Sequence, residues 1–328
     1  VAQLDGDLKA DDLRGQYIDP ALSELQPRRL ITLAPTINAN QGLETLVAAY
    51  CPLPEEGGGT TACGDVVVLR GGHDALRDGM SILQPLLPPS MPSWVWWNGF
   101  LDEAPDLMDQ LACAPRRLIL DTAVGNASHC LNLLRSRVES GQAVNDLNWL
   151  RLRSWRETLA MVFDPPNRRD ALCHITQLDI DVEGHHPAQG LLMAAWIADR
   201  LGWQLQGSKV SEEGVTAQFS RHDGADIRFQ LMTVPTGQPS VHAGQMVGLR
   251  LICQPEQGQG VCVILCAESG GCMRLEGGGM ASLELHEEIV SVQHASPEMD
   301  VARLLSGGHD STNPLLAAAA PLAARLLN

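Results

Sequence analysis

The chain has 328 residues, of which 45% are hydrophobic, and a formal net charge of −16. This length is sufficient for two domains with separate cores. The strong negative charge argues against a general nucleic-acid binder and against a protein of anionic membrane surfaces. No apolar run reaches the roughly 18 residues of a membrane helix, and no signal peptide opens the sequence, so we expect a cytoplasmic protein. Nine cysteines without paired CxxC spacing predict mainly reduced thiols, not a structural zinc site.

The first half of the sequence alternates between strand-like and helix-like segments. Residues 1–27 are polar and acidic and are expected to form a leading segment with one short helix. Beyond them, expected strands cover 28–35, 65–71, 93–99 and 116–122, and expected helices lie near 41–49, 75–85, 104–112 and 127–138. Such alternation is typical of crossover units on a parallel sheet covered by helices. It predicts an α/β domain over residues 28–163.

The segment DLNWLRLRSWRETLAMVFDPP, residues 146–166, predicts a helix that closes this domain. Asp146 is suited to cap the helix, and apolar residues recur at helical spacing to give it one apolar face. Pro165 and Pro166 are expected to end it, because proline cannot donate the next backbone hydrogen bond.

Residues 164–328 predict an α+β domain with a mainly antiparallel sheet. The run 175–182 alternates apolar and polar residues as a half-buried strand does, and Pro187 can open a helix over 187–203. Short strands separated by turn residues are expected at 216–221, 225–234, 246–254, 260–267, 272–277 and 281–286. A final helix over 313–328 is expected to be interrupted at Pro321.

A basic region lies in the middle of this acidic chain. Residues 116–169 contain nine arginines against five acidic residues, and five of the seven tryptophans lie between residues 94 and 155. Arginine and tryptophan are enriched in protein interfaces, so one interpretation is a docking surface for a carboxylate-rich partner or a phosphorylated ligand. The alternative is core packing of the tryptophans beside a solvated helix face with local salt bridges. The candidate partner-binding residues are Trp96, Trp97, Arg116, Arg117, Trp149, Arg151, Arg153, Trp155 and Arg156.

The usual motifs of nucleotide binding, hydrolysis and zinc catalysis are absent. The sequence contains no GxGxxG, GxxxxGK[ST], GxSxG or HExxH motif, so we predict no catalytic residue, no cofactor and no metal site. Asp121 carries more weight as a ligand-binding candidate than the His–Asp pairs at 73–74 and 309–310, because it stands at the carboxyl end of an expected parallel strand. It is equally suited to cap a helix or to pair with Arg116 or Arg117.

Two cysteines flank a predicted hairpin turn. Cys266 and Cys272 enclose the sequence AESGG, and a turn there would place them on neighbouring strands. They are then either two free thiols or a disulfide, which in a reducing compartment would be regulatory.

Several of these blocks together resemble a known family. RRLITLAP, LLPPSMPSWVWWNG, RRLILDT, DLNWLRLRSWRETLAMVFDPP and the helix ending in ADRLGW are similar to the glucose-6-phosphate dehydrogenase assembly protein OpcA of cyanobacteria and actinobacteria, without the family's usual N-terminal region. The resemblance implies a non-enzymatic protein that binds oligomeric glucose-6-phosphate dehydrogenase and tunes its activity in the oxidative pentose phosphate pathway. It also implies thioredoxin-dependent redox control, to which Cys266 and Cys272 are suited. The alternative is a sugar-phosphate-binding α/β enzyme with a site at the strand ends near Asp121.

Overall fold

The structure is a computed structural model. It describes residues 28–50, 64–87, 92–113, 116–235, 244–254, 261–268, 272–278, 288–291, 297–306 and 311–328. The expected leading segment 1–27 and the expected strand 281–286 lie outside these ranges. The described residues form two compact units. The first is drawn from Val1–Gly99, Glu103–Ile119 and Ala295–Ser311, and the second from Phe100–Asp102, Leu120–His294 and Thr312–Asn328. The predicted division after residue 163 stays a prediction.

The first unit is built on a three-stranded sheet in the order β1-β3-β2. Strand β1 (Arg28–Pro35) pairs in parallel with β3 (Gly64–Gly71), and β2 (Glu44–Tyr50) pairs with β3 in the antiparallel sense. The prediction of a helix near 41–49 was therefore wrong. Pairing with β3 along its whole length holds β2 extended, and such pairing overrides the modest helix propensity of this segment.

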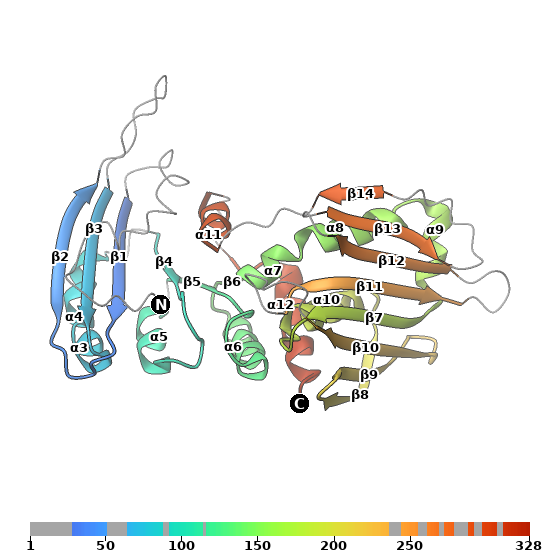
Figure 1. The fold of residues 1–328 in the computed structure, drawn as a ribbon, viewed down its shortest axis with the longest axis horizontal. Coiled ribbons are helices and arrows are strands. Elements are labelled where there is room, and N and C mark those ends of the chain that lie inside the picture. The colour runs from blue at the N-terminus through green and yellow to red at the C-terminus, as the bar shows by residue number, and fades with distance from the viewer. Residues whose placement is uncertain are drawn as a thin grey trace, which may run out of the picture. The chain divides into compact units, whose positions relative to one another are not determined.

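Short helices and a second strand pair complete this unit (Figure 1). The elements are α3 (His73–Asp78), α4 (Met80–Leu83), η1 (Gln84–Leu86), β4 (Trp94–Trp96), α5 (Pro105–Leu111), β5 (Arg117–Leu120) and α11 (Pro297–Ser306). Strands β4 and β5 pair in parallel, as the sequence predicts. A buried apolar cluster forms part of the core, with its members on β3, α3, α4 and α5: Val67, Leu69, Leu76, Leu83 and Leu107.

The second unit contains an eight-stranded sheet in the order β14-β13-β12-β11-β7-β10-β9-β8 (Figure 1). Its strands are β7 (Ile175–Glu183), β8 (Gln204–Ser211), β9 (Gly214–Ser220), β10 (Asp226–Val234), β11 (Met246–Cys253), β12 (Val261–Glu268), β13 (Cys272–Gly278) and β14 (Glu288–Ser291). Every neighbouring pair is antiparallel except β7 and β10, which are parallel. With the parallel strands of the first unit, this sheet confirms the predicted fold class.

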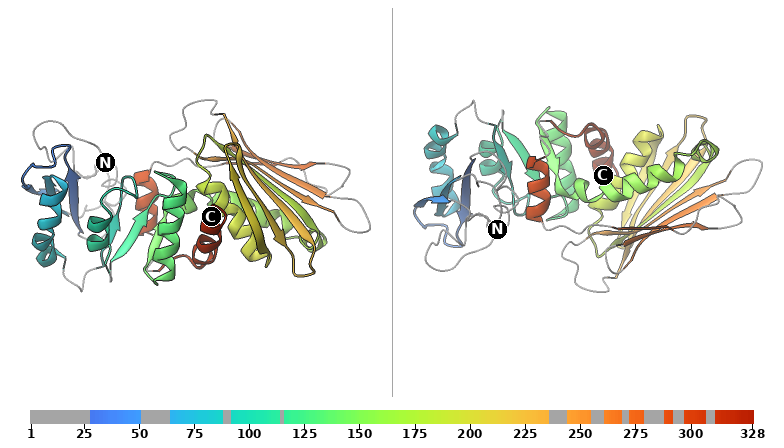
Figure 2. Two further views of the ribbon diagram at one scale, coloured as in Figure 1. Left: turned by 90° about the horizontal axis from the view of Figure 1, so that it is seen from below. Right: turned by 90° about the horizontal axis from the view of Figure 1, so that it is seen from above.

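Helix α10 (Ala188–Arg200) covers one face of that sheet. Gly190 makes the close approach possible, because a Cβ atom there would lie 2.6 Å from Leu231 and 3.0 Å from both Ile180 and Val182. Figure 2 shows the helices of this unit on the same side of the sheet. The strand residues of β7 alternate accordingly: Ile180 and Val182 are buried, whereas Asp181 on the opposite face is only partly buried.

Two further helices pack beside α10. Helix α12 (Pro314–Arg325) contacts both α6 (Ala127–Glu139) and α10, and its alanines make the contact close. The Thr312 hydroxyl, just before α12, donates to the Gln142 carbonyl oxygen. The predicted interruption at Pro321 was wrong, since α12 runs through this proline without a break. Packing against two helices outweighs the single backbone hydrogen bond that the proline removes.

The Arg- and Trp-containing segment follows β6 (Val144–Asp146) and forms two helices where one was predicted. Helix α7 (Leu147–Arg151) ends at Leu152, and α8 (Arg153–Phe163) begins directly after it. The predicted apolar face is confirmed: Leu152, Trp155, Leu159, Val162 and Phe163 are all buried. A third helix, α9 (Pro166–Leu172), starts at the second of the two prolines. None of the described helices has the length and apolar character needed to cross a lipid bilayer.

Candidate functional site

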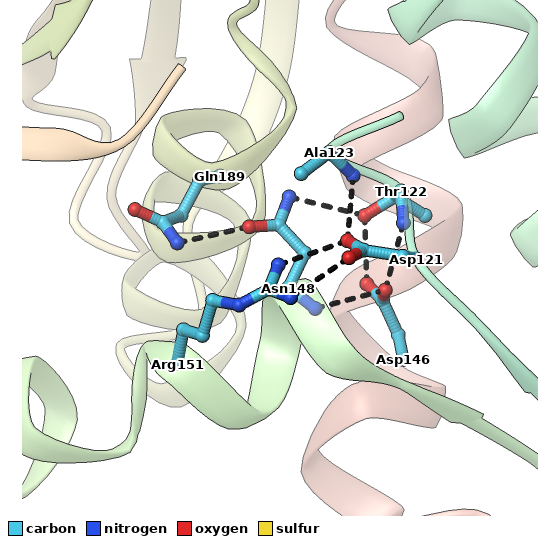
Figure 3. Close-up of polar contacts among 7 residues, drawn as sticks. All are labelled: Asp121, Thr122, Ala123, Asp146, Asn148, Arg151 and Gln189. Carbon is cyan, nitrogen blue, oxygen red and sulfur yellow. Dashed lines mark hydrogen bonds and ion pairs between the residues drawn. The ribbon is translucent and has the colours of Figure 1, made fainter. Parts of the chain in front are cut away.

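Asp146 is the centre of a buried polar network at the start of α7 (Figure 3). As predicted, its side chain caps the helix, accepting a hydrogen bond from the Asn148 backbone N–H at 3.1 Å. It also accepts from the backbone N–H of Thr122 at 2.9 Å and bonds to the Thr122 hydroxyl at 2.8 Å. One carboxylate therefore joins the residues that follow β5 to the first turn of α7.

The network continues from α7 into α10 and the sheet. The Asn148 side-chain amide donates to the Thr122 hydroxyl oxygen at 3.1 Å, and its carbonyl oxygen accepts from Gln189 at 2.9 Å. Gln189 in turn accepts from the Met246 backbone N–H. All three side chains are buried, so each bond satisfies a group that would otherwise be costly to remove from water. The network fixes α7 relative to α10 and β11.

Asp121 forms a two-pronged ion pair with Arg151 of α7. Arg151 Nη1 lies 3.0 Å from Asp121 Oδ1, and Nη2 lies 2.8 Å from Oδ2. Their side chains are 14% and 10% exposed, respectively. The predicted pairing of Asp121 with Arg116 or Arg117 is corrected by this geometry: Asp121 pairs with Arg151, thirty residues away. Asp121 also accepts from the Ala123 backbone N–H at 3.0 Å, which holds the turn after β5.

Burial shapes the protonation of this network. Burial first, and then the nearby charge of Asp121, raise the pKa of Asp146 from 3.8 to about 7. The hydrogen bonds from Thr122 and Asn148 oppose that rise without cancelling it. His186 bonds through Nε2 to the Gly125 carbonyl oxygen at 3.0 Å, and burial lowers the pKa of this imidazole. Within the described ranges, no three His, Cys, Asp or Glu side chains gather in a way that could hold a metal ion.

The remaining candidates in this unit divide into buried rings and surface charges. Trp149 and Trp155 are 4% and 3% exposed, so both rings belong to the interior. Arg153 has a 70% exposed side chain and pairs with Glu157 one turn later at 2.7 Å. Arg156 is partly buried, and its guanidinium carbon lies 3.6 Å from the centre of the Trp149 ring. Stacking of this kind contributes roughly 0.5–2 kcal/mol.

The other four candidates belong to the first unit, where each has an intramolecular role. Trp97 packs against the apolar cluster of β3 and α5, and Trp96 is half-buried in β4. Arg116 donates to the Leu111 carbonyl oxygen at 2.9 Å, at the C-terminal end of α5. Arg117 lies over the Trp94 ring, 4.7 Å from its centre.

The two strands predicted on either side of the turn between Cys266 and Cys272, β12 and β13, are present and pair in the antiparallel sense, whereas residues 269–271 between them lie outside the described ranges. In their register Cys266 lies opposite Arg274, and Cys272 lies opposite Glu268. The two cysteines are therefore diagonal neighbours, for which a separation of about 7–8 Å is usual, more than a disulfide spans without backbone movement. The redox role of this pair stays a prediction.

Sequence reasoning missed three members of the network: Thr122, Asn148 and Gln189. They come from three separate parts of the chain, and each belongs to a residue type that is ordinarily exposed. The only local signal was the pair Asp121 and Thr122 directly after a strand.

Two family models match nearly the whole chain. Residues 19–136 match the model described as glucose-6-phosphate dehydrogenase subunit N-terminal domain, and residues 142–320 match the C-terminal domain of the same subunit. Among solved structures, the glucose-6-phosphate 1-dehydrogenase of Mycobacterium avium is similar over 80% of this chain and 74% of its own. With 12% identity and a TM-score of 0.46, this similarity does not establish a shared fold.

Curated relatives give the same assignment. The chain is 32% identical to the OxPP cycle protein OpcA of Synechococcus elongatus over 297 residues, covering 89% of this chain and 66% of that protein. For the protein of the same name from Synechocystis sp. the identity is 32%, with 90% and 62% covered. The chain thus spans less than two thirds of the length of these relatives. The matches over both parts of the sequence show that the chain belongs to the OpcA family of glucose-6-phosphate dehydrogenase assembly proteins.

Proposed function

We propose that this chain binds oligomeric glucose-6-phosphate dehydrogenase and promotes its active assembly in the oxidative pentose phosphate pathway, without catalysing a reaction itself. Membership of the OpcA family supports a role tied to this enzyme. The proposed location is the cytoplasm, where the composition of the chain leads us to expect it.

The proposed contact surface is the outer face of α8. Arg153 and Arg156 lie on this helix, within the basic middle of a chain whose net charge is −16. The preceding helix is held by Asp146 and by the ion pair between Asp121 and Arg151. A rigid support of this kind lets surface charges bind a partner without first being ordered, which lowers the entropic cost of association. This placement is the observation on which the proposed surface rests.

A protein without a reacting group can alter an enzyme only by binding one of its states more tightly than another. We therefore expect the apparent KM for glucose 6-phosphate to fall on addition of this chain, with a smaller change in kcat. Steady-state kinetics of the cognate dehydrogenase, with and without a saturating amount of the chain, test this. Denatured chain is the matched control. Unchanged kinetics together with no detectable complex would remove the proposal.

Redox control through thioredoxin is a finer part of the proposal. Cys266 and Cys272 lie on the adjacent, antiparallel strands β12 and β13, respectively. Replacing both by Ser should abolish any redox dependence of dehydrogenase activation, while binding under reducing conditions stays nearly unchanged. Redox sensitivity that persists in the double variant would exclude this pair.

The alternative function is a sugar-phosphate-binding enzyme with its site near Asp121. Both oxygens of Asp121 are engaged by Arg151, and one also accepts from the Ala123 N–H, so this carboxylate has its hydrogen-bonding capacity largely used. Binding of a phosphosugar to the isolated chain, measured by calorimetry, would favour this alternative.

A further inference from the structure

The arginines of the α7–α8 segment differ in how their charges are balanced. Arg151 is paired with Asp121, and Arg153 with Glu157. Among the described residues, no carboxylate forms an ion pair with Arg156, and no oxygen accepts a hydrogen bond from its guanidinium, whose Nη1 atom is buried. The flat face of this guanidinium lies against Trp149. Arg156 is thus a fixed, poorly hydrated positive charge without a counter-ion.

Such a charge is unfavourable for the folded chain. Burial lowers the pKa of Arg156 to about 10, and the charge of Arg153 acts in the same direction, while Glu157 opposes both. The guanidinium remains ionised near neutral pH, so the cost of its removal from water is not relieved by loss of the proton. Methionine would fill similar space without that cost.

Building on the proposed function, we infer that Arg156 is the docking point for a single carboxylate of the dehydrogenase. Three features favour a carboxylate. The planar guanidinium of arginine can bind a carboxylate through two parallel hydrogen bonds from its Nε and Nη2 atoms, neither of which is among the buried unpaired atoms, while Nη1 stays buried. Stacking on Trp149 fixes the plane of that fork in advance. Glu157 already pairs with Arg153, so of the three described arginines of α7 and α8 Arg156 is the one without a paired carboxylate, and a single charge matches one aspartate or glutamate better than a phosphate with its higher charge.

The surroundings of Arg156 are suited to a protein partner. Ala160 lies one turn after Arg156 on the same face of α8 and is exposed. Met161, next to it, is 44% exposed although it is a large apolar residue. Ala160 is the residue that shares the face of Arg156, and its small side chain leaves room for a partner to approach the guanidinium.

The test compares Arg156→Met with the control Arg200→Met, which removes an exposed arginine of α10 that is already paired with Asp199 and lies outside the proposed contact surface. Affinity for the cognate dehydrogenase and the midpoint of thermal unfolding are measured for both variants and for the unchanged chain. We expect Arg156→Met to weaken binding at least tenfold while thermal stability is retained or increased. Arg200→Met should weaken binding less than about threefold. Arg156→Lys should fall between the unchanged chain and Arg156→Met, because lysine keeps the charge but not the fork.

The possible failures are distinguishable. If the unchanged chain does not bind the dehydrogenase, the proposed function itself fails. If the unchanged chain binds and Arg156→Met binds equally well, only the inference about Arg156 is overturned. Arg156→Met could also unfold at a lower temperature and bind normally where it is fully folded. That result would show a structural role for Arg156 and would overturn the inference that it binds a carboxylate. As a positive identification, neutralising one dehydrogenase carboxylate should weaken binding to the unchanged chain tenfold and leave binding to Arg156→Met unaffected.

Discussion

Arg151 and Asp121 meet through two parallel hydrogen bonds in a nearly buried position, joining α7 to the turn after β5. From the sequence, Arg151 was predicted to bind a partner and Asp121 to bind a ligand. In the structure these two residues are paired with each other. Both are therefore part of the support of the α8 surface. The contact also explains how a short helix of five residues is kept in place.

Replacing Asp121 by Ala should destabilise the second unit by about 3–5 kcal/mol, because Arg151 is left as a buried charge without its partner. Urea denaturation followed by circular dichroism measures the loss. The double variant Asp121→Leu with Arg151→Met should recover most of it, since neither charge then remains. If the decrease in unfolding free energy of the double variant equalled the sum of the decreases of the two single variants, this account of the pair would be contradicted.

The stability of the chain should depend on the protonation of Asp146. Its pKa is about 7 in the folded chain and 3.8 ordinarily, so the folded state retains a proton that the unfolded state releases. The contribution of this group is thus fully present below about pH 4 and is lost as the pH rises to about 7. Asp146→Asn is neutral throughout. The free energy of unfolding of the unchanged chain, minus that of the variant, should fall between pH 5 and pH 7. If the difference in unfolding free energy stayed constant over this range, the raised pKa of Asp146 would be refuted.

Gly190 should tolerate no side chain. Its Cβ would lie 2.6 Å from the Cδ1 atom of the buried Leu231, so Gly190→Ala forces either that side chain or α10 to shift. We expect a cost of about 1–3 kcal/mol in chemical denaturation. Gly207→Ala is the control, because nothing lies within 4 Å of a Cβ at that position of β8. The control should change stability by less than about 0.5 kcal/mol; equal effects of the two substitutions would argue against the close packing of α10.

Thiol reactivity should distinguish two exposed cysteines from two buried ones. Burial raises the pKa of both Cys130 and Cys253 to about 12, so these thiols stay protonated and unreactive. Cys113 and Cys173 are exposed. In the native chain at pH 8, a maleimide should modify the exposed pair rapidly and the buried pair only on unfolding, as mass spectrometry of peptides would show. Rapid native labelling of Cys130 would contradict its buried position in α6.

Local patterns in the sequence were sufficient for much of the fold. Strand β1 occupies the predicted residues 28–35, and the apolar face of α8 was correctly assigned, because both follow from the spacing of side chains along one element. Strand β2 was mistaken for a helix, since what holds it extended is pairing with β3, a contact between segments distant in sequence. The continuity of α12 through Pro321 likewise depends on packing against other helices.

The candidate site was less accessible to sequence reasoning. The composition of α7 and α8 identified their arginines as candidates, but it did not indicate which other residues surround each arginine. That Arg151 is neutralised by Asp121 while Arg156 is not depends on how two segments thirty residues apart approach each other. Gln189 entered the network from still farther along the chain, through contacts to Asn148 and the Met246 backbone. No spacing rule relates such residues, and only the folded arrangement brings them together.

The position of α12 has a consequence during protein synthesis. Its buried alanines cover apolar surface of α6 and α10, yet more than a hundred residues separate the end of α10 at Arg200 from the start of α12 at Pro314. At translation rates of about 5–20 residues per second, the ribosome needs on the order of ten seconds to make that stretch. Throughout this interval the nascent chain lacks the helix that covers these apolar surfaces of α6 and α10 in the finished fold. Chaperones that recognise such surfaces therefore have their opportunity to bind before α12 emerges.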